Sequence, residues 1–374
     1  MDITDLKIGR DATFIPPLKS NLNTLKVYEK DGYDSLFFAD HIMNWIPKSI
    51  WTPDITNLAS VYESPHLIYE AFTMMSIAAL NTKKVKLGTG VTETFRRHPA
   101  VLAQTLLTLD QLSNGRTILG IGTGEKENII PYGIKWNNPV SRLEEAIKII
   151  RLLWENEEKF DYNGKFWNLK NAIFSLKPHK SGRYPPIWLA AHGPRMLDIT
   201  GRLGDGWLPI YLNPDTYKEK LKIIKASVQK AGRDFEKFTP ALYVNVIVDE
   251  DPDESKRMTK SVIAKNHMLT LYNEDFQQYG LTHPLGDNID GVVDYIPPNF
   301  ERDTILNIIN KVPSEMCYDF YINGTPDMVI KRIESYANVG VKHIVLFNYS
   351  ILCDLKKIPS SNKCMKMILD YFKN

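Results

Sequence analysis

The chain has few cysteines and no long apolar run. Its three cysteines, Cys317, Cys353 and Cys364, form no CxxC pair and no cluster with histidines, so neither a zinc site nor a disulfide framework is expected. No apolar stretch approaches the roughly 20 residues that span a bilayer. The first residues also lack the basic segment and apolar run of a secretory signal. We therefore expect a cytoplasmic protein with no transmembrane segment.

An excess of one charge is also absent. The 46 Lys and Arg residues nearly balance the 44 Asp and Glu residues, which leaves a net charge of +2. Because basic and acidic residues are interspersed, we expect no nucleic-acid partner and no binding to an anionic membrane. The composition, 43% hydrophobic and 24% charged, supplies enough apolar residues for a large core over 374 residues.

Short apolar or β-branched runs alternate with amphipathic segments. Predicted strands are Lys7–Phe14, Ser35–Asp40, Val85–Val91, Arg116–Gly122, Pro186–Ala191, Gly206–Ile210, Leu242–Val248 and His343–Asn348. Predicted helices are Asn21–Asp31, Leu67–Leu80, Ala100–Leu112, Ser141–Trp154, Arg195–Arg202, Pro214–Ala231 and Pro326–Val339. Ser141 followed by Glu144 predicts a capping box. Eight strands alternating with helices favour an α/β fold, a parallel (β/α)8 TIM barrel.

Two segments are too long to be ordinary connections between a strand and a helix. We interpret residues 155–184 and 249–325 as insertions. The second is long enough for several helices, and we expect it to cover the mouth of the barrel. Because there is no internal repeat and no low-complexity linker, residues 1–374 are predicted to form a single domain.

Barrels of this kind place their active sites at the C-terminal ends of the strands. Asp40 ends the second predicted strand, His41 follows it, and Trp45 comes four residues after His41. Histidine exchanges protons near neutral pH, and an adjacent carboxylate could fix its tautomer or raise its pKa. A helix cap beside a packed histidine would give the same sequence.

Glycines end the next two predicted strands. The third ends in Gly88-Thr89-Gly90-Val91, and the fourth ends in Gly120-Ile121-Gly122 and is followed by Thr123-Gly124-Glu125. Alternate glycines would leave one strand face bare for a flat ligand, with Glu125 projecting into the mouth. Neither run is a Rossmann or P-loop motif. A tight turn with a glutamate at the start of a helix is the alternative interpretation.

A further pattern follows the fifth strand. His192, Gly193 and Pro194 open a helix, and a helix N-terminus binds phosphate readily. Arg195 either adds a contact there or is a surface residue. Trp45, Trp51, Trp207 and Tyr211 would give the site an apolar lining, or would pack in the core. Together these features suit a planar redox cofactor with a phosphate tail better than hydrolysis.

At these residues the chain resembles the luciferase-like superfamily, in particular its F420-dependent branch. The matching segments are ADHIMNW (Ala39–Trp45), LGTGVTETFRRHPAVLAQ (Leu87–Gln104), GRTILGIGTGEKEN (Gly115–Asn128), WLAAHGPRML (Trp188–Leu197) and GRLGDGW (Gly201–Trp207). The mycobacterial phthiodiolone ketoreductases give the most similar pattern, which includes Pro131–Ala146, His283–Pro297 and Ile322–Ile330. F420-dependent glucose-6-phosphate dehydrogenases and methylene-tetrahydromethanopterin reductases are more distantly similar.

The resemblance implies a role for each matched residue. Gly90–Val91 would be a non-prolyl cis peptide behind the deazaflavin ring. The cofactor would be lined by Asp40, Thr123, Gly124, Glu125 and Asn128, and its phosphate would be held by the backbone of His192 and Gly193. His41 and Glu125 match residues implicated in proton transfer, and Trp45 would shape the substrate side. The resemblance also implies a homodimer.

The implied function is hydride transfer between coenzyme F420 and a carbonyl, alcohol or imine carbon, with His41 as the preferred acid. The lysine that sugar-phosphate dehydrogenases carry after the sixth strand is missing from Trp207–Pro214. A phosphorylated sugar is therefore disfavoured, and a less polar, small or lipid-like substrate is expected. Two alternatives remain: an FMN-dependent monooxygenase on the same fold, and a non-catalytic luciferase-like barrel. No metal is expected.

Overall fold

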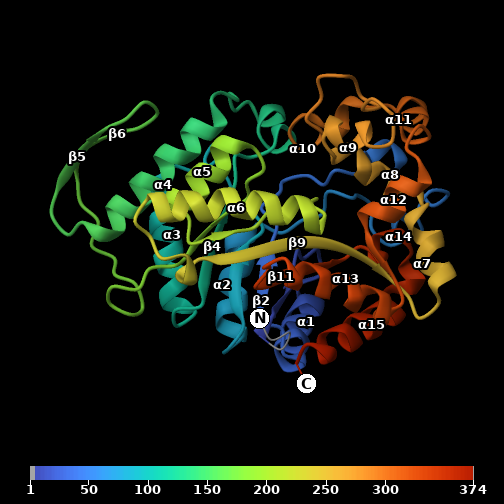
Figure 1. Ribbon diagram of the computed structural model, residues 1–374, viewed down its shortest axis with the longest axis horizontal. Coiled ribbons are helices and arrows are strands. Elements are labelled where there is room, and N and C mark those ends of the chain that lie inside the picture. Colours follow the sequence, from blue (N-terminus) through green and yellow to red (C-terminus); the bar gives the residue numbers. More distant parts are fainter. Residues whose placement is uncertain (1–4, 374) are drawn as a thin grey trace.

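The computed structural model describes residues 5–373, in which eight parallel strands close into a barrel (Figure 1). In barrel order the strands are β1 (Lys7–Asp11), β2 (Ser35–Phe38), β3 (Lys86–Thr89), β4 (Thr117–Ile121), β7 (Ile187–Leu189), β8 (Gly206–Trp207), β9 (Thr239–Val248) and β11 (His343–Asn348). β9 pairs with both β8 and β11, and β11 pairs with β1, which completes the ring. The predicted (β/α)8 TIM barrel is confirmed.

Helices lie between the strands and surround the barrel. They are α1 (Leu18–Asp31), α2 (Ala71–Asn81), α3 (Pro99–Leu112), α4 (Pro139–Glu155), α5 (Pro194–Leu203), α6 (Pro214–Lys230), α13 (Pro326–Asn338) and α15 (Ile358–Tyr371). All seven predicted helices are present. The sequence analysis missed α15, which follows β11 and a short helix, α14 (Ser350–Cys353).

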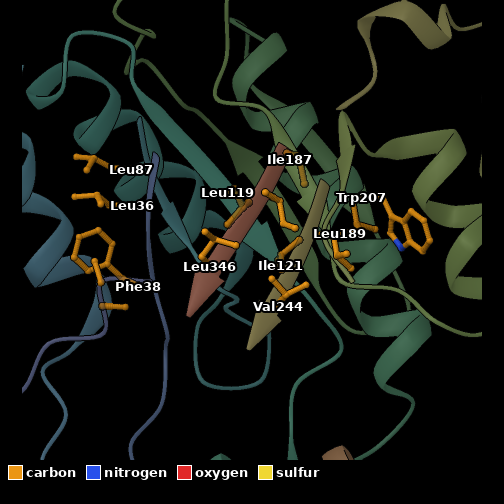
Figure 2. Close-up of a cluster of buried hydrophobic side chains, with 14 of the residues drawn as sticks. Leu36, Phe38, Leu87, Leu119, Ile121, Ile187, Leu189, Trp207, Val244 and Leu346 are labelled. Carbon is orange, nitrogen blue, oxygen red and sulfur yellow. The ribbon is translucent and has the colours of Figure 1, made fainter. Parts of the chain in front are cut away.

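The strands bury both of their faces. On β2, Leu36 and Phe38 belong to a large apolar layer between strands and helices, whereas Phe37 between them packs inside the barrel. Figure 2 shows part of the outer layer, with side chains from successive strands such as Leu87 and Leu119. Full burial of each such side chain is worth about 1.5–3 kcal/mol. Because both faces are buried, the sequences of the strands are continuous apolar runs and do not alternate between apolar and polar residues.

Several predicted boundaries are wrong by a few residues. β3 ends at Thr89, so Gly90 and Val91 lie just beyond the strand. β9 begins at Thr239, three residues earlier than predicted, and includes Pro240. Proline is tolerated there because it lies near the start of the strand, and its carbonyl still accepts a hydrogen bond from the Lys342 N–H.

The predicted capping box at Ser141 and Glu144 is wrong. Helix α4 begins at Pro139, and its N-cap residue is Asn138, whose side chain makes no capping hydrogen bond. Proline favours this earlier start because its fixed φ angle already suits the first helical position. Glu144 instead accepts hydrogen bonds from Lys148 and Arg202.

The first expected insertion contains a two-stranded antiparallel hairpin, β5 (Phe160–Asn163) and β6 (Asn168–Ala172). It projects from the barrel beyond α4 (Figure 1). Glu145 of α4 holds the hairpin, because its buried carboxylate accepts N–H groups from Lys165, Phe166 and Trp167.

The second expected insertion forms a cluster of short helices at one end of the molecule (Figure 1). Its elements are α7 (Pro252–Thr259), α8 (Val262–His267), α9 (Asn273–Gln277), α10 (Gly291–Asp294), α11 (Arg302–Ile309), α12 (Ser314–Phe320) and β10 (Ile322–Gly324). An apolar cluster of its own joins Phe276 and Tyr295 to Ile50 and Trp51 of the segment after β2. β10 pairs with the last residues of β9. None of the helices between residues 5 and 373 combines the length and the apolar character needed to cross a bilayer.

Candidate active site

A cavity of about 1460 Å³ lies at the C-terminal ends of the barrel strands. Ligand pockets usually measure about 300–1,000 Å³, so this cavity has room for a large cofactor together with a substrate. Val91, Ala190 and Leu208 line it from the barrel, and His267 and Tyr321 line it from the second insertion. The insertion therefore forms one wall of the chamber at the barrel mouth, as expected.

The structure brings all the predicted site residues together around this cavity. The lining includes Asp40, His41, Trp45, Gly90, Val91, Thr123, Gly124, Glu125, Asn128, His192 and Gly193. The Gly90–Val91 peptide bond is cis, which confirms that part of the prediction. These residues come from four different strand ends, so the barrel is what gathers them.

The glycines within and just after β4, Gly120 and Gly122, do not leave a strand face bare as predicted. A Cβ atom on Gly120 would lie 1.9 Å from the Thr89 carbonyl oxygen. On Gly122 it would lie 3.2 Å from a Val91 methyl carbon and 3.4 Å from the Ala190 Cβ. Gly120 therefore allows β3 and β4 to approach closely, because the space is already occupied by backbone. The room for a flat ligand lies beyond the strands, beside Thr123 and Gly124.

Asp40 does not orient His41, contrary to the first interpretation of this pair. Its carboxylate is buried and accepts hydrogen bonds from Thr92 Oγ1 (2.6 Å) and from Arg97 (2.5 Å). Arg96 lies 3.0 Å from the same carboxylate. The carboxylate of Asp40 thus pairs with the guanidinium groups of Arg96 and Arg97. Its main contribution is to hold the ends of β2 and β3 together.

Asn128 is the residue that orients His41. Its Oδ1 accepts the backbone N–H groups of Ile42 (2.6 Å) and Met43 (3.1 Å). The amide therefore presents its Nδ2 donor to His41 Nδ1, at 3.1 Å. Nδ1 must accept this hydrogen bond, so the proton of the neutral imidazole lies on Nε2. Nε2 lies 3.4 Å from Glu125 Oε2.

Glu127 is a site residue that the sequence analysis missed. It is fully buried behind His41, and its Oε1 accepts hydrogen bonds from Trp45 Nε1 (3.0 Å) and Asn128 Nδ2 (2.8 Å). Burial, followed by the negative charge of Glu125, raises the pKa of Glu127 well above its ordinary value. The only sequence signal was the carboxylate two residues after Glu125, which would have placed both at one strand end.

One nitrogen of His41 and carboxylate oxygens of Glu125 and Glu127 lie within 4.8 Å of one another. That spacing alone would also suit a cation. However, Asn128 already donates to His41 Nδ1, and both Trp45 and Asn128 donate to Glu127 Oε1. Donors at these atoms favour a cluster that holds protons over one that binds a metal.

Aromatic residues form the wall opposite the strand ends. Trp45 stacks on His267 at 5.7 Å between ring centroids, and His267 lies within 3.0 Å of the Tyr211 and Tyr321 hydroxyls. Burial lowers the pKa of His267 to about 3, so the ring is neutral. His267 was not predicted, because it lies in the insertion, where no strand end marks it.

Only two of the four predicted lining aromatics face the cavity. Trp45 and Tyr211 do. Trp207 is completely buried beneath the helices, where it stacks on Tyr217 and donates to the Ala191 carbonyl. Trp51 donates to the Tyr62 carbonyl within the apolar cluster of the insertion. The core interpretation therefore holds for Trp51 and Trp207.

The far end of the cavity meets the N-terminus of α5. Gly193 is the N-cap residue, no side chain caps the helix, and a Cβ on Gly193 would meet nothing within 4 Å. Lys220 donates to the His192 carbonyl at 2.7 Å and also lines the cavity. Arg195 instead lies on the surface, where it donates to Ser141. The free N–H groups, the open space and Lys220 suit an anionic group.

Comparisons with known proteins agree with this geometry. The family model for luciferase-like monooxygenases matches residues 5–343. A phthiodiolone/phenolphthiodiolone dimycocerosates ketoreductase of Mycobacterium tuberculosis is 36% identical over 363 residues, covering 96% of this chain and 94% of the relative. The 5,10-methylenetetrahydromethanopterin reductase of Archaeoglobus fulgidus is 30% identical, covering 86% and 87%.

A solved structure has the same fold along its whole length. It is an F420-dependent secondary alcohol dehydrogenase in complex with an F420-acetone adduct, with a TM-score of 0.77, 22% identity and 99% coverage of both chains. The match of the family model over most of the sequence and the long alignments at 30% and 36% identity point to one family. The chain therefore belongs to the luciferase-like monooxygenase family of oxidoreductases.

Proposed function

We propose that this protein transfers hydride between coenzyme F420 and the carbonyl or alcohol carbon of a weakly polar substrate. The observation that carries the proposal is the single cavity described above. It connects an uncapped helix N-terminus at Gly193 with the His41–Glu125 pair, and its remaining wall is aromatic. A ketoreductase among the relatives favours the carbonyl/alcohol pair of substrates.

The cavity fits a deazaflavin with an anionic tail. The open space at Gly193, the free N–H groups of α5 and Lys220 would hold the phosphate. The Gly90–Val91 backbone, Thr123 and Gly124 would line the ring. When bound, the deazaflavin supplies or accepts the hydride, and the protein orients the reactants and manages the proton.

The residues of this chain define where the substrate oxygen would lie. His41 Nε2 carries a proton toward the cavity, and Glu125 lies beside it. A carbonyl oxygen that accepts this N–H would also lie next to a carboxyl group. Positioned acids of this kind typically contribute about 10²–10⁴-fold to a rate. Trp45 and His267 would exclude water from the same region.

Cofactor binding tests the proposal directly. Purified protein is titrated separately with F420 and with FMN, and quenching of the cofactor's own fluorescence is measured. We expect saturable binding of F420 that weakens when Lys220 is replaced by alanine. Tight FMN binding without F420 binding would instead support a monooxygenase, and binding of neither would support a non-catalytic barrel.

A further inference from the structure

We propose that Glu127 stores the proton that Glu125 passes to the substrate oxygen, so that the two carboxyl groups share one proton. This inference rests on the proposed function, because it assigns the source of the proton in that reaction. Glu125 lines the cavity and would touch the substrate, whereas Glu127 would act through it.

The hydrogen bonds of Glu127 indicate where the stored proton lies. Oε1 accepts from Trp45 and Asn128, but Oε2 has no donor among the described residues although it is buried. Its carboxylate neighbour is Glu125. A carboxylate oxygen of Glu125 lies within 4.8 Å of one of Glu127, so two ionised groups would repel each other, and a buried oxygen without a partner is costly. A proton on Oε2 that is donated to Glu125 removes both penalties.

The two residues differ in exposure, which decides which of them keeps the proton. The side chain of Glu127 is 0% exposed, while that of Glu125 is 23% exposed and is also within reach of the His41 Nε2–H. Water and the N–H donor stabilise the charge on Glu125. The nearest basic side chain in sequence, Lys126, is paired with Asp294 of α10. The resting pair is therefore a neutral Glu127 beside an ionised Glu125.

His41 does not supply the transferred proton, which revises its expected role as the acid. Its Nδ1 must accept from Asn128, and the Asn128 amide cannot turn over because Ile42 and Met43 hold its oxygen. The ring therefore carries a single proton, on Nε2. Losing that proton would leave an imidazolate, so His41 acts as a neutral hydrogen-bond donor to the developing alkoxide.

The proton balance of ketone reduction then closes without another reagent. Hydride adds to the carbonyl carbon, and the C=O π pair moves to oxygen. The proton on Glu127 Oε2 moves to the Glu125 carboxylate, and Glu125 then passes it to that oxygen. The O–H bond of Glu127 breaks and the O–H bond of the alcohol forms. The pair, left without a proton, regains one from solvent through the exposed edge of Glu125. Alcohol oxidation runs the same steps in reverse.

The pair should control the pH dependence of turnover. The titratable groups facing it are His41, Tyr132, Tyr211 and Tyr272, and the Lys126–Asp294 ion pair lies alongside. The three tyrosines have raised pKa values, with burial as the largest cause, so all three are uncharged at neutral pH. Ketone reduction should therefore slow as rising pH removes the shared proton.

Replacing Glu127 by glutamine tests the proton store, because Glu127→Gln keeps the shape and the acceptor for Trp45 but has no transferable proton. We expect kcat for ketone reduction to fall by about 10²-fold, with KM and the F420 dissociation constant nearly unchanged and the loss of rate at high pH abolished. A variant with the wild-type kcat and pH profile would overturn the proposal, since a purely structural Glu127 tolerates this substitution.

Infrared spectroscopy of the ligand-free protein tests the proton itself, independently of turnover. Wild-type protein at neutral pH should show a protonated carboxyl band that is absent from Glu127→Gln. The matched control, Glu145→Gln, should keep the band, because Glu145 is a buried carboxylate bonded by backbone N–H groups. Absence of the band difference, or a stoichiometric divalent metal in the purified protein, would overturn the proposal.

The two readouts separate this inference from the proposed function. A band difference in a protein that binds no F420 would leave the proton-sharing pair standing and refute the proposed function. F420 binding without the band difference would leave the proposed function standing and refute the proton-sharing pair. If Glu127→Gln fails to fold, the carboxyl band of the wild-type protein is titrated with pH instead. The proposal requires that this band disappear only well above the pH range in which a glutamic acid ordinarily loses its proton.

Discussion

Among single residues, Asn128 controls where protons and hydrogen bonds lie in the site. Its oxygen is held by two backbone N–H groups, so its nitrogen faces both His41 and Glu127. This one amide thus fixes which nitrogen of His41 carries the proton. It also donates one of the two hydrogen bonds that the buried Glu127 accepts. Neither contact is visible in the sequence, where Asn128 and His41 are far apart.

Changing this amide to a carboxylate should therefore move a proton. In Asn128→Asp, the group facing His41 Nδ1 becomes an acceptor, and we expect the ring proton to shift from Nε2 to Nδ1. Nitrogen NMR of selectively labelled histidine distinguishes the two tautomers. Turnover should fall by about 10²-fold, because the N–H donor to the substrate oxygen is lost. A spectrum that still shows the Nε2–H form would contradict the assigned orientation of Asn128.

The residues of the site were largely predictable, but their partners were not. Asp40, His41, Glu125 and His192 were expected at the cavity because each lies within a few residues of a strand end, and a barrel brings strand ends together. The pairing of Asp40 with His41 was wrong, since Arg96 and Arg97 approach Asp40 from the segment after β3. Side-chain pairing depends on loop paths, which sequence patterns do not specify.

At the scale of secondary-structure elements, β3 and β4 are held close by Gly120. Because a Cβ there would lie 1.9 Å from the Thr89 carbonyl oxygen, Gly120→Ala must push two strands apart. We expect the free energy of unfolding, measured by urea denaturation, to fall by about 1–3 kcal/mol or more. Gly193→Ala is the matched control, because its Cβ would enter open space and its φ angle of −77° suits alanine. Equal stability of the two variants would refute this account.

Strands and helices of the barrel were predicted better than the insertions for a physical reason. Barrel strands are buried on both faces and barrel helices on one, so both leave clear apolar patterns. Helices such as α9 and α10 have only 5 and 4 residues. They are set by contacts within the insertion's own apolar cluster, and so short a segment shows no periodicity.

For the molecule as a whole, buried histidines make stability depend on pH. Burial lowers the pKa of His192, His267 and His343 to about 3, whereas a histidine in the unfolded chain titrates near 6.5. As the pH falls below about 6.5, the unfolded state binds protons that the native state does not. Each such histidine therefore costs about 1.4 kcal/mol of stability per pH unit in that range.

His343 offers the cleanest test of this effect, because it lies inside the barrel beside Ser35 Oγ and away from the cavity lining. Between pH 7 and pH 5, wild-type protein should lose about 2 kcal/mol more than His343→Gln in the free energy of unfolding. Urea denaturation at both pH values measures the difference. Parallel loss in the two proteins would mean that His343 is able to take up a proton in the native state.

The wall over the barrel mouth is built with an apolar cluster separate from that of the barrel, and it meets β9 through β10. Substitutions in the helices of that wall can therefore reshape the chamber while the barrel strands keep their own packing. In evolutionary terms, the wall of the chamber and the barrel strands are packed by different sets of apolar side chains. If the proposed function holds, drift in the wall would change which substrate the chamber accepts while the hydride transfer is kept.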